Sequence, residues 1–139
     1  MKPALLDTNV LLALAWPNHQ HHASAYRWFD QEAKDAWATC AVTELGFIRL
    51  SSNPAYTADA VSPQEAAELL RQYCAHPAHR FWRSSPACKV DVYKHAIGHQ
   101  QVTDAWLVEV ARQNGGRVVT LDRRLKAHDS SGKLVVVVA

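Results

Sequence analysis

The stretch LLDTNVLLALAW, residues 5–16, places one acidic residue, Asp7, inside an otherwise apolar run. The apolar residues after Asp7 predict a helix over residues 9–16 that ends before Pro17, whose ring disfavours helix continuation. An isolated buried carboxylate costs several kcal/mol, so Asp7 needs a partner, and capping the following helix is the simplest one. The stretch therefore predicts a short buried strand, residues 3–7, that leads directly into a helix.

The rest of the chain repeats this alternation of short apolar strands and helices. Ser62 and Glu65 form a capping box, which predicts a helix over residues 62–74, and Gly115 predicts the end of a helix that starts with Thr103 as its N-cap. Unbroken apolar strands between helices predict a three-layer α/β/α sandwich with a mostly parallel central sheet. The remaining expected strands cover residues 36–40, 80–82, 117–122 and 134–138, and the remaining expected helices cover 21–34, 42–50 and 91–99.

Length and composition indicate one globular domain, residues 1–139, because 139 residues with 48% hydrophobic content can bury a core of ordinary size. The chain has no run of about 20 apolar residues and no signal-peptide pattern, so we expect a cytoplasmic protein without a membrane partner. Its three cysteines, Cys40, Cys74 and Cys88, contain no C-x-x-C pair and are expected to be reduced.

Four acidic residues fall at the carboxyl ends of predicted strands or in the first turn of the next helix: Asp7, Glu44, Asp104 and Asp122. In a parallel sheet these positions meet at one edge. Carboxylates gathered there repel one another unless a cation neutralises them, and all-oxygen ligands suit Mg²⁺, for which Mn²⁺ can substitute. Such a site can activate water against a phosphodiester, so the pattern predicts metal-assisted hydrolysis.

Hydroxyl and amide side chains accompany these acids. They can hydrogen-bond the carboxylates or the waters around a metal. Ordinary N-capping is the alternative explanation, most clearly for Thr43 and Thr103. The candidates for the supporting role are Thr8, Asn9, Thr103 and Thr120.

Four segments in this order and spacing resemble one known family: LLDTNVLLAL, VTELGFIRL, VTDAWLVEVA and GGRVVTLD. The chain is similar to the PIN domain, specifically to the VapC-type ribonuclease toxins of toxin–antitoxin pairs. The resemblance covers essentially the whole chain. It implies a Mg²⁺- or Mn²⁺-dependent endoribonuclease that cuts a structured RNA, such as a tRNA or a ribosomal RNA loop, and inhibits translation until a cognate antitoxin binds it.

The resemblance also implies roles for individual residues. Asp7, Glu44 and Asp104 match the acids of the family, and Asp122 matches a fourth acid that varies more within it. Asp7, Asp104 and Asp122 are then the expected metal ligands, with Glu44 acting directly or through water. The family further implies a homodimer, and a hetero-oligomer in which the C-terminal segment of the antitoxin covers the acidic groove and can place an arginine among the carboxylates.

A formal net charge of +2 is too small to indicate RNA binding by itself, so local features matter more. The candidates for RNA contact are Arg49, Arg123, Arg124 and Trp82. His19, His21 and His22 follow a helix-breaking proline but lack a distant ligand of matching type, so no role is assigned to them.

Two other functions fit parts of the pattern. An Asp that ends the first strand of an α/β sheet can accept a phosphoryl group in a Mg²⁺-dependent phosphatase, but such enzymes usually have a second acid two residues later, where this chain has Asn9. A non-enzymatic RNA-binding or assembly module with the same fold is the other alternative. Loss of one or more acids is expected in such a module, and this chain has all four.

Overall fold

The computed structural model describes residues 2–33, 36–83 and 85–138, and within them a five-stranded sheet forms the centre of the molecule. The strand order is β3-β2-β1-β4-β5, and every neighbouring pair is parallel. The predicted α/β class is therefore confirmed, with a wholly parallel sheet in the described residues. The strands are β1 (Ala4–Leu6), β2 (Trp37–Thr39), β3 (His79–Phe81), β4 (Arg117–Thr120) and β5 (Val135–Val137).

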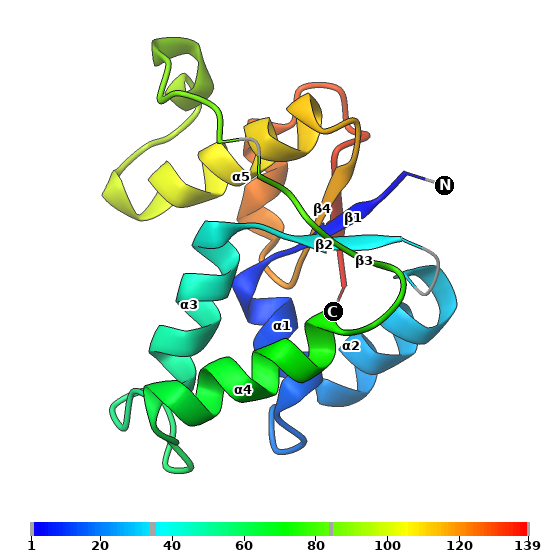
Figure 1. Cartoon of the computed structure of the whole chain (residues 1–139). Helices are drawn as coiled ribbons and strands as arrows, with labels where there is room; N and C mark the ends of the chain where they lie inside the picture. Colours follow the sequence, from blue (N-terminus) through cyan, green and yellow to red (C-terminus); the bar gives the residue numbers. More distant parts are fainter. Residues whose placement is uncertain (1, 34–35, 84, 139) are drawn as a thin grey trace.

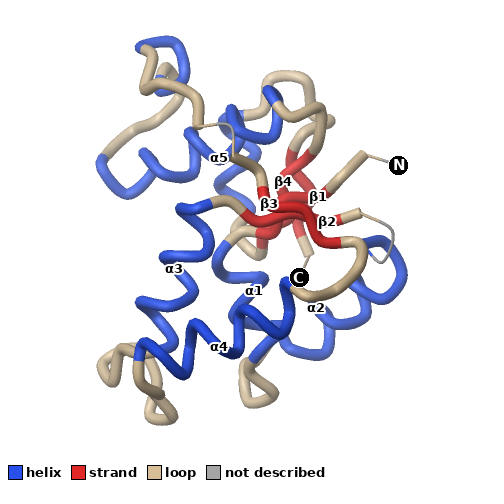
Figure 2. Tube along the Cα trace, viewed as in Figure 1, coloured by secondary structure: helices blue, strands red, loops and turns tan. Residues whose placement is uncertain are grey.

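Helices cover both faces of this sheet (Figure 1). Figure 2 shows the strands between α5 on one side and α1–α4 on the other. The α-helices are α1 (Thr8–Ala15), α2 (His22–Trp28), α3 (Ala41–Ser51), α4 (Pro63–Cys74) and α5 (Val102–Gln113). The shorter turns are the π-helical η1 (Phe29–Ala33) and the 3₁₀-helical η2 (Val90–Tyr93), η3 (His99–Gln101) and η4 (Arg123–His128).

Successive residues of the central strands enter two different cores, because side chains alternate across a strand. Leu6 and Val119 pack in the core under α1–α4, whereas Leu5 and Val118 pack in the core under α5. All four are fully buried. This double burial explains why the strands appear in the sequence as unbroken apolar runs. Among the described helices, none is both long and apolar enough to cross a membrane.

The sheet also defines where a ligand site is expected. From β1 the chain moves outward through β2 to β3, and it then returns to the other side of β1 with β4 and β5. The strand order therefore reverses between β1 and β4. In open parallel sheets, ligands bind at such a reversal, beyond the carboxyl ends of the two strands. Asp7 follows β1 directly at this point, and Asp122 lies two residues beyond β4.

Two predicted N-caps are wrong. Helix α3 begins at Ala41 with Cys40 as its cap, and Thr43 sits inside the first turn, where its hydroxyl contacts the Cys40 backbone. Helix α5 begins at Val102, so Thr103 is its second residue. The 3₁₀ turn η3 continues directly into α5, so this helix needs no side-chain cap at Thr103.

The helix predicted over residues 91–99 is also wrong. Only two short 3₁₀ turns, η2 and η3, form in this part of the chain, separated by turns and an extended Gly98. Val90 is 88% exposed and Ile97 is 91% exposed, so the segment has little core to pack against, and tertiary packing supplies most helix stability. The predicted helix over 21–34 forms as α2 and η1, and Lys34 lies outside the described residues.

Candidate active site

Asp7 is the central side chain of the site at the strand-order reversal. It is only 8% exposed and caps α1, with its Oδ1 accepting a hydrogen bond from the Thr8 backbone N–H at 2.7 Å. Its Oδ2 accepts a second hydrogen bond, also 2.7 Å long, from the Thr120 hydroxyl at the end of β4. The Asp7 carboxylate therefore both caps α1 and contacts the end of β4 at the strand-order reversal.

Asn9 and Thr120 hold the two sides of the reversal together. The Asn9 side-chain oxygen accepts a hydrogen bond from the Leu121 backbone N–H at 3.2 Å, and its amide nitrogen donates to the Thr120 hydroxyl at 3.3 Å. The same hydroxyl accepts from the Asp122 backbone N–H at 3.0 Å. This network connects the start of α1 to the chain after β4, and it fixes the direction of the Asp7 carboxylate.

Burial raises the pKa of Asp7 to about 6, because an ionised carboxylate loses its hydration in the protein interior. The hydrogen bond from Thr120 opposes this shift, and the negative charges of Asp104 and Asp122 add to it. The pKa of Asp104, in the first turn of α5, is also raised, by burial first and by the charge of Asp122 second. The three aspartates thus affect one another electrostatically, and we call Asp7, Asp104 and Asp122 the Asp7 cluster.

Asp122 has a cation beside it that the other two aspartates do not share. Arg124 contacts both carboxylate oxygens of Asp122, at 2.8 Å to Oδ2 and 3.0 Å to Oδ1. This guanidinium holds the pKa of Asp122 below its usual range and slightly counteracts the charge of Asp122 felt at Asp104. The Asp7 cluster therefore carries one neutralised carboxylate and two whose ionisation is costly.

Glu44 lies in the first turn of α3, and its hydrogen bond goes in a different direction. Its Oε2 accepts a hydrogen bond from the Thr39 hydroxyl at 2.6 Å, and the same hydroxyl lies 2.8 Å from Nε2 of His79. Cys74, the last residue of α4, completes this group, since the ligand atoms of Glu44, Cys74 and His79 all lie within 4.8 Å of one another. We call Glu44, Cys74 and His79 the Glu44 cluster.

Sequence reasoning did not single out Cys74 or His79 as functional residues. The available signal was their spacing, with a thiol and an imidazole five residues apart in YCAHPAH. Burial, together with the charge of Glu44, raises the pKa of Cys74 to about 11, and burial lowers the pKa of His79. Both side chains are therefore neutral near pH 7 in the free protein.

Close helix packing brings the two clusters into the same region of the molecule. Gly46 of α3 faces Thr8 at the start of α1, and a Cβ atom at Gly46 would lie 2.6 Å from the Thr8 hydroxyl oxygen. The Thr8 hydroxyl in turn donates to the Thr43 carbonyl at 3.4 Å. Glycine at this position lets α3, which carries Glu44, approach the helix that Asp7 caps.

The candidates for RNA contact divide into exposed and buried residues. Arg49 of α3 and Arg123 and Arg124 of η4 are exposed, so their side chains are available to a ligand. Trp82 is only 9% exposed and packs on Gly116, so the structure does not offer its ring face for stacking on a base. Thr103 is exposed on the first turn of α5.

The histidines after Pro17 make local contacts to the backbone. His22 lies 2.7 Å from the Ala13 carbonyl through Nδ1, and Nδ1 of His19 accepts a hydrogen bond from the His21 N–H at 3.0 Å. These contacts stabilise the connection between α1 and α2.

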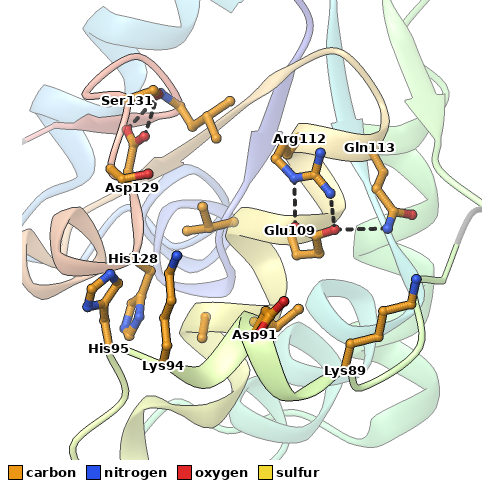
Figure 3. Close-up of a pocket in the computed structure, with 15 residues that line it drawn as sticks. Lys89, Asp91, Lys94, His95, Glu109, Arg112, Gln113, His128, Asp129 and Ser131 are labelled. Atoms are coloured by element: carbon orange, nitrogen blue, oxygen red, sulfur yellow. Dashed lines mark hydrogen bonds and ion pairs between the residues drawn. The ribbon is translucent and has the colours of Figure 1, made fainter.

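A cavity of about 400 Å³ lies beside α5, between η2 and the segment after η4 (Figure 3). His95 and His128 stand next to each other at one end, and both ring nitrogens of His128 are buried with no hydrogen-bond partner among the described residues. Asp104 raises the pKa of His128, although burial lowers it more. His128 therefore connects this cavity to the Asp7 cluster.

This geometry corresponds to a class of α/β proteins with acids at the reversal of a parallel sheet, and the comparisons with known proteins agree with it. The model of the PIN domain matches residues 4–130. Ribonuclease VapC39 of Mycobacterium tuberculosis is 40% identical over 137 residues, which cover 96% of this chain and 99% of that protein. Ribonuclease VapC38 of the same organism is 43% identical over 119 residues, covering 86% and 84%.

A solved structure shows the same fold at low sequence identity. The crystal structure of M. tuberculosis VapC20, titled as a toxin that cleaves the sarcin–ricin loop, matches with a TM-score of 0.64 and 15% identity. The match covers 91% of this chain and 95% of that one. The chain belongs to the PIN-domain family and, within it, to the VapC toxin family. The resemblance inferred from the four sequence segments is thereby confirmed.

Proposed function

We propose that this protein is a metal-dependent endoribonuclease and the toxin of a toxin–antitoxin pair, and that residues 1–139 act as one domain. The observation that carries the proposal is the Asp7 cluster, in which burial and neighbouring carboxylates raise the pKa of both Asp7 and Asp104 beside the strand-order reversal of a VapC-family fold. The names of the relatives support ribonuclease activity. Structured RNA, either tRNA or ribosomal RNA, is the proposed substrate, and inhibition of translation is the proposed effect.

The donor set of the Asp7 cluster fits Mg²⁺ or Mn²⁺. Its three residues offer only carboxylate oxygens, which hard divalent ions prefer. The raised pKa of Asp7 supports this choice, because a carboxylate that is costly to ionise gains most from a nearby cation. Asp7, Asp104 and Asp122 would hold the metal, with Glu44 acting directly or through water. A bound ion of this kind supplies activation of water and charge stabilisation at a phosphodiester.

The protein's own side chains orient this site. Thr120 and the Thr8 N–H fix both oxygens of Asp7, and Asn9 holds Thr120 in place. Asn9 occupies the position where a phosphatase of the aspartyl-phosphate type would carry its second acid, and here it is used as a structural amide. This arrangement favours hydrolysis by an activated water over phosphoryl transfer to Asp7.

Cations near the site are the proposed contacts to RNA phosphates. Arg123 and Arg124 are exposed directly after Asp122, and Arg49 is exposed on α3. Lys94 lines the cavity beside α5, which also contains His128, a residue whose pKa the charge of Asp104 affects. Lys and Arg contacts to phosphate are independent of base sequence, so these residues would position RNA and would not select the base that is cut.

The proposed partners besides RNA are a cognate antitoxin and a second copy of the chain. Leu45 directly follows Glu44 and is 61% exposed, so an apolar side chain is available to a protein partner next to the site. Arg124 on Asp122 shows that a guanidinium fits against a carboxylate of the Asp7 cluster. An arginine supplied by the antitoxin would use the same chemistry on Asp7 or Asp104.

Mapping of RNA 5′ ends tests the proposed function. Total RNA is incubated with purified protein in Mg²⁺, in Mn²⁺ and in EDTA, alongside the variants Asp7→Asn and Asp30→Asn. Discrete cuts that disappear in EDTA and with Asp7→Asn, but persist with the exposed-surface control Asp30→Asn, would establish the nuclease and identify its target. RNA binding without cuts under any metal would instead indicate a non-enzymatic RNA-binding module, and cuts by Asp7→Asn equal to wild type would overturn the assignment.

A further inference from the structure

The Glu44 cluster gathers three kinds of donor atom from three separate elements. Glu44 comes from the first turn of α3, Cys74 is the last residue of α4, and His79 is the first residue of β3. Their carboxylate, thiol and imidazole ligand atoms lie within 4.8 Å of one another, and all three residues are half-buried. The cluster is thus open to an ion from solvent and rigidly anchored in secondary structure.

The spacing is close to what a small cation requires. With metal–nitrogen and metal–sulfur bonds of about 2.0 and 2.3 Å, a tetrahedral ion needs its ligand atoms roughly 3.3–3.8 Å apart. Atoms that already lie within 4.8 Å reach this spacing by side-chain rotation of about an ångström.

The surroundings of His79 also match those of a metal-bound imidazole. Its ring hydrogen-bonds the backbone of Cys74, and its Nε2 lies 2.8 Å from the Thr39 hydroxyl. Because the Thr39 hydroxyl donates to Glu44, Nε2 of His79 carries the N–H that donates to Thr39 in the metal-free protein, and metal binding would move this proton to Nδ1 so that Nε2 can coordinate the ion. Metal-binding histidines commonly have their other N–H held by a backbone carbonyl or a carboxylate.

Thr39, the last residue of β2, contacts two members of the Glu44 cluster, Glu44 and His79. Its side chain is fully buried at the end of β2, and its hydroxyl donates to Glu44 Oε2 at 2.6 Å. The hydroxyl therefore fixes one oxygen of Glu44 and leaves the other free. This contact aims the carboxylate at Cys74 and His79.

We propose that Glu44, Cys74 and His79 form a binding site for a borderline-soft divalent ion, with Zn²⁺ as the natural occupant; its donor atoms differ from those of the Asp7 cluster, although Glu44 is available to both sites. One sulfur, one nitrogen and one oxygen donor suit Zn²⁺, whereas Mg²⁺ binds oxygen and does not compete for a thiolate. Three protein ligands leave a fourth position for water or another small ligand. Binding deprotonates the Cys74 thiol, and the released proton goes to the buffer.

Cobalt titration tests this site without measuring nuclease activity. Metal-free, reduced protein is titrated with Co²⁺, whose thiolate complexes give a near-ultraviolet charge-transfer band and whose tetrahedral complexes give strong visible bands. We expect both sets of bands to saturate at one ion per chain and to disappear when Zn²⁺ displaces Co²⁺. Absence of a thiolate band in the wild-type protein would overturn the proposal.

Variants assign the ligands. Cys74→Ser should abolish the thiolate band and His79→Gln should weaken Zn²⁺ binding by at least about tenfold, whereas Cys88→Ser, at an exposed cysteine outside the cluster, should change neither. Asp7→Asn should also retain the band, so the proposal can hold even if the Asp7 cluster is not a nuclease centre. A band that survives Cys74→Ser, or that disappears with Cys88→Ser, would contradict the assignment.

A measurement on the wild-type chain covers the case in which Cys74→Ser fails to fold. Zn²⁺ should slow alkylation of Cys74 by a maleimide at least about tenfold, as followed by peptide mass analysis, while Cys88 in the same sample reacts at an unchanged rate. Mg²⁺ should give no protection. Equal alkylation of Cys74 with and without Zn²⁺ would refute the site.

Discussion

The Asp7 cluster and the Glu44 cluster begin from equivalent positions but collect different donor atoms. Asp7 directly follows β1, and Glu44 lies in the first turn of the helix that follows β2, the neighbouring strand. Around Asp7 the partners are Asp104 and Asp122, so the cluster contains only oxygen. Around Glu44 the partners are Cys74 and His79, so the cluster mixes oxygen, sulfur and nitrogen.

The two clusters also draw their donor atoms from different elements. β1 pairs with β4, which lies on the other side of the strand-order reversal and carries Asp122 beyond its end. β2 pairs with the edge strand β3, whose first residue is His79. The two clusters therefore offer an all-oxygen donor set beside β1 and a mixed donor set beside β2.

The largest expected effect separates the two clusters by activity. Asp104→Asn should reduce RNA cleavage by roughly 10³-fold, because loss of a metal-ligating carboxylate removes several kcal/mol of transition-state stabilisation. Asp59 is an exposed acid outside both clusters. Asp59→Asn should therefore cleave RNA at a rate within about twofold of wild type, a change of less than about 0.5 kcal/mol in the activation barrier. Single-turnover cleavage of one mapped RNA measures both. An Asp104→Asn protein as active as Asp59→Asn would remove the Asp7 cluster from the proposed mechanism.

The second effect is on stability and follows from the pKa of Asp7. The fold raises this pKa from 3.8 to about 6, so the folded protein holds the proton more tightly than the unfolded chain. Stability therefore falls as pH rises from about 4 to about 6 and stays lowered above that, by about 3 kcal/mol at ~1.4 kcal/mol per pH unit. Asp7→Asn should remove this penalty in metal-free protein.

Urea denaturation in EDTA measures this effect. Asp7→Asn should be more stable than wild type by about 2–3 kcal/mol at pH 8 and nearly equal to it at pH 4. Asp30→Asn, at an exposed position, serves as the matched control and should follow wild type at both pH values. A difference between Asp7→Asn and wild type that does not change with pH would refute burial of the Asp7 charge as its cause.

A third effect arises because Glu44 is shared by the two proposed sites. Zn²⁺ bound with Cys74 and His79 withdraws the Glu44 carboxylate from a nuclease centre, so Zn²⁺ added to the Mn²⁺-activated enzyme should lower cleavage about tenfold. Cys74→Ser should keep most of its activity under the same conditions. Equal inhibition of wild type and Cys74→Ser would show that Zn²⁺ acts elsewhere, for example by direct exchange at the Asp7 cluster.

The smallest effect concerns the cation inside the Asp7 cluster. Arg124→Ala should free the Asp122 carboxylate and tighten Mn²⁺ binding about threefold to fivefold, which is the range expected for an exposed ion pair. Arg123→Ala removes a neighbouring exposed arginine and should leave Mn²⁺ affinity unchanged. Isothermal titration with Mn²⁺ compares the two variants, and weaker binding by Arg124→Ala would mean that the guanidinium supports the site.

The fold and the Asp7 cluster follow from the sequence for a common physical reason. Burial of a parallel sheet on both faces produces apolar runs such as LLD and RVVTLD, and the acid that ends each run marks the carboxyl edge of the sheet. Asp7, Glu44, Asp104 and Asp122 were predicted to meet on that basis. The charges of Asp104 and Asp122 act on Asp7, whereas Glu44 hydrogen-bonds Thr39 and lies with Cys74 and His79. The catalytic role of the four acids stays a prediction.

The Glu44 cluster did not follow from the sequence, because its members are related only through tertiary packing. Cys74 is the last residue of α4 and His79 is the first residue of the three-residue edge strand β3. No sequence pattern predicts that side chains at these two positions lie near Glu44. The region after β3 was mispredicted as a helix for a related reason. Its exposed Val90 and Ile97 follow a helical spacing without a core to pack against.

Manganese binding tests the central claim most directly, because it asks whether the Asp7 cluster holds the metal. Free Mn²⁺ is followed by electron paramagnetic resonance during titration of metal-free wild type, Asp104→Asn and Cys74→Ser. We predict that wild type and Cys74→Ser bind one or more Mn²⁺ ions with equal affinity and that Asp104→Asn binds at least about tenfold more weakly. Unchanged Mn²⁺ binding by Asp104→Asn, or its loss in Cys74→Ser, would contradict the account.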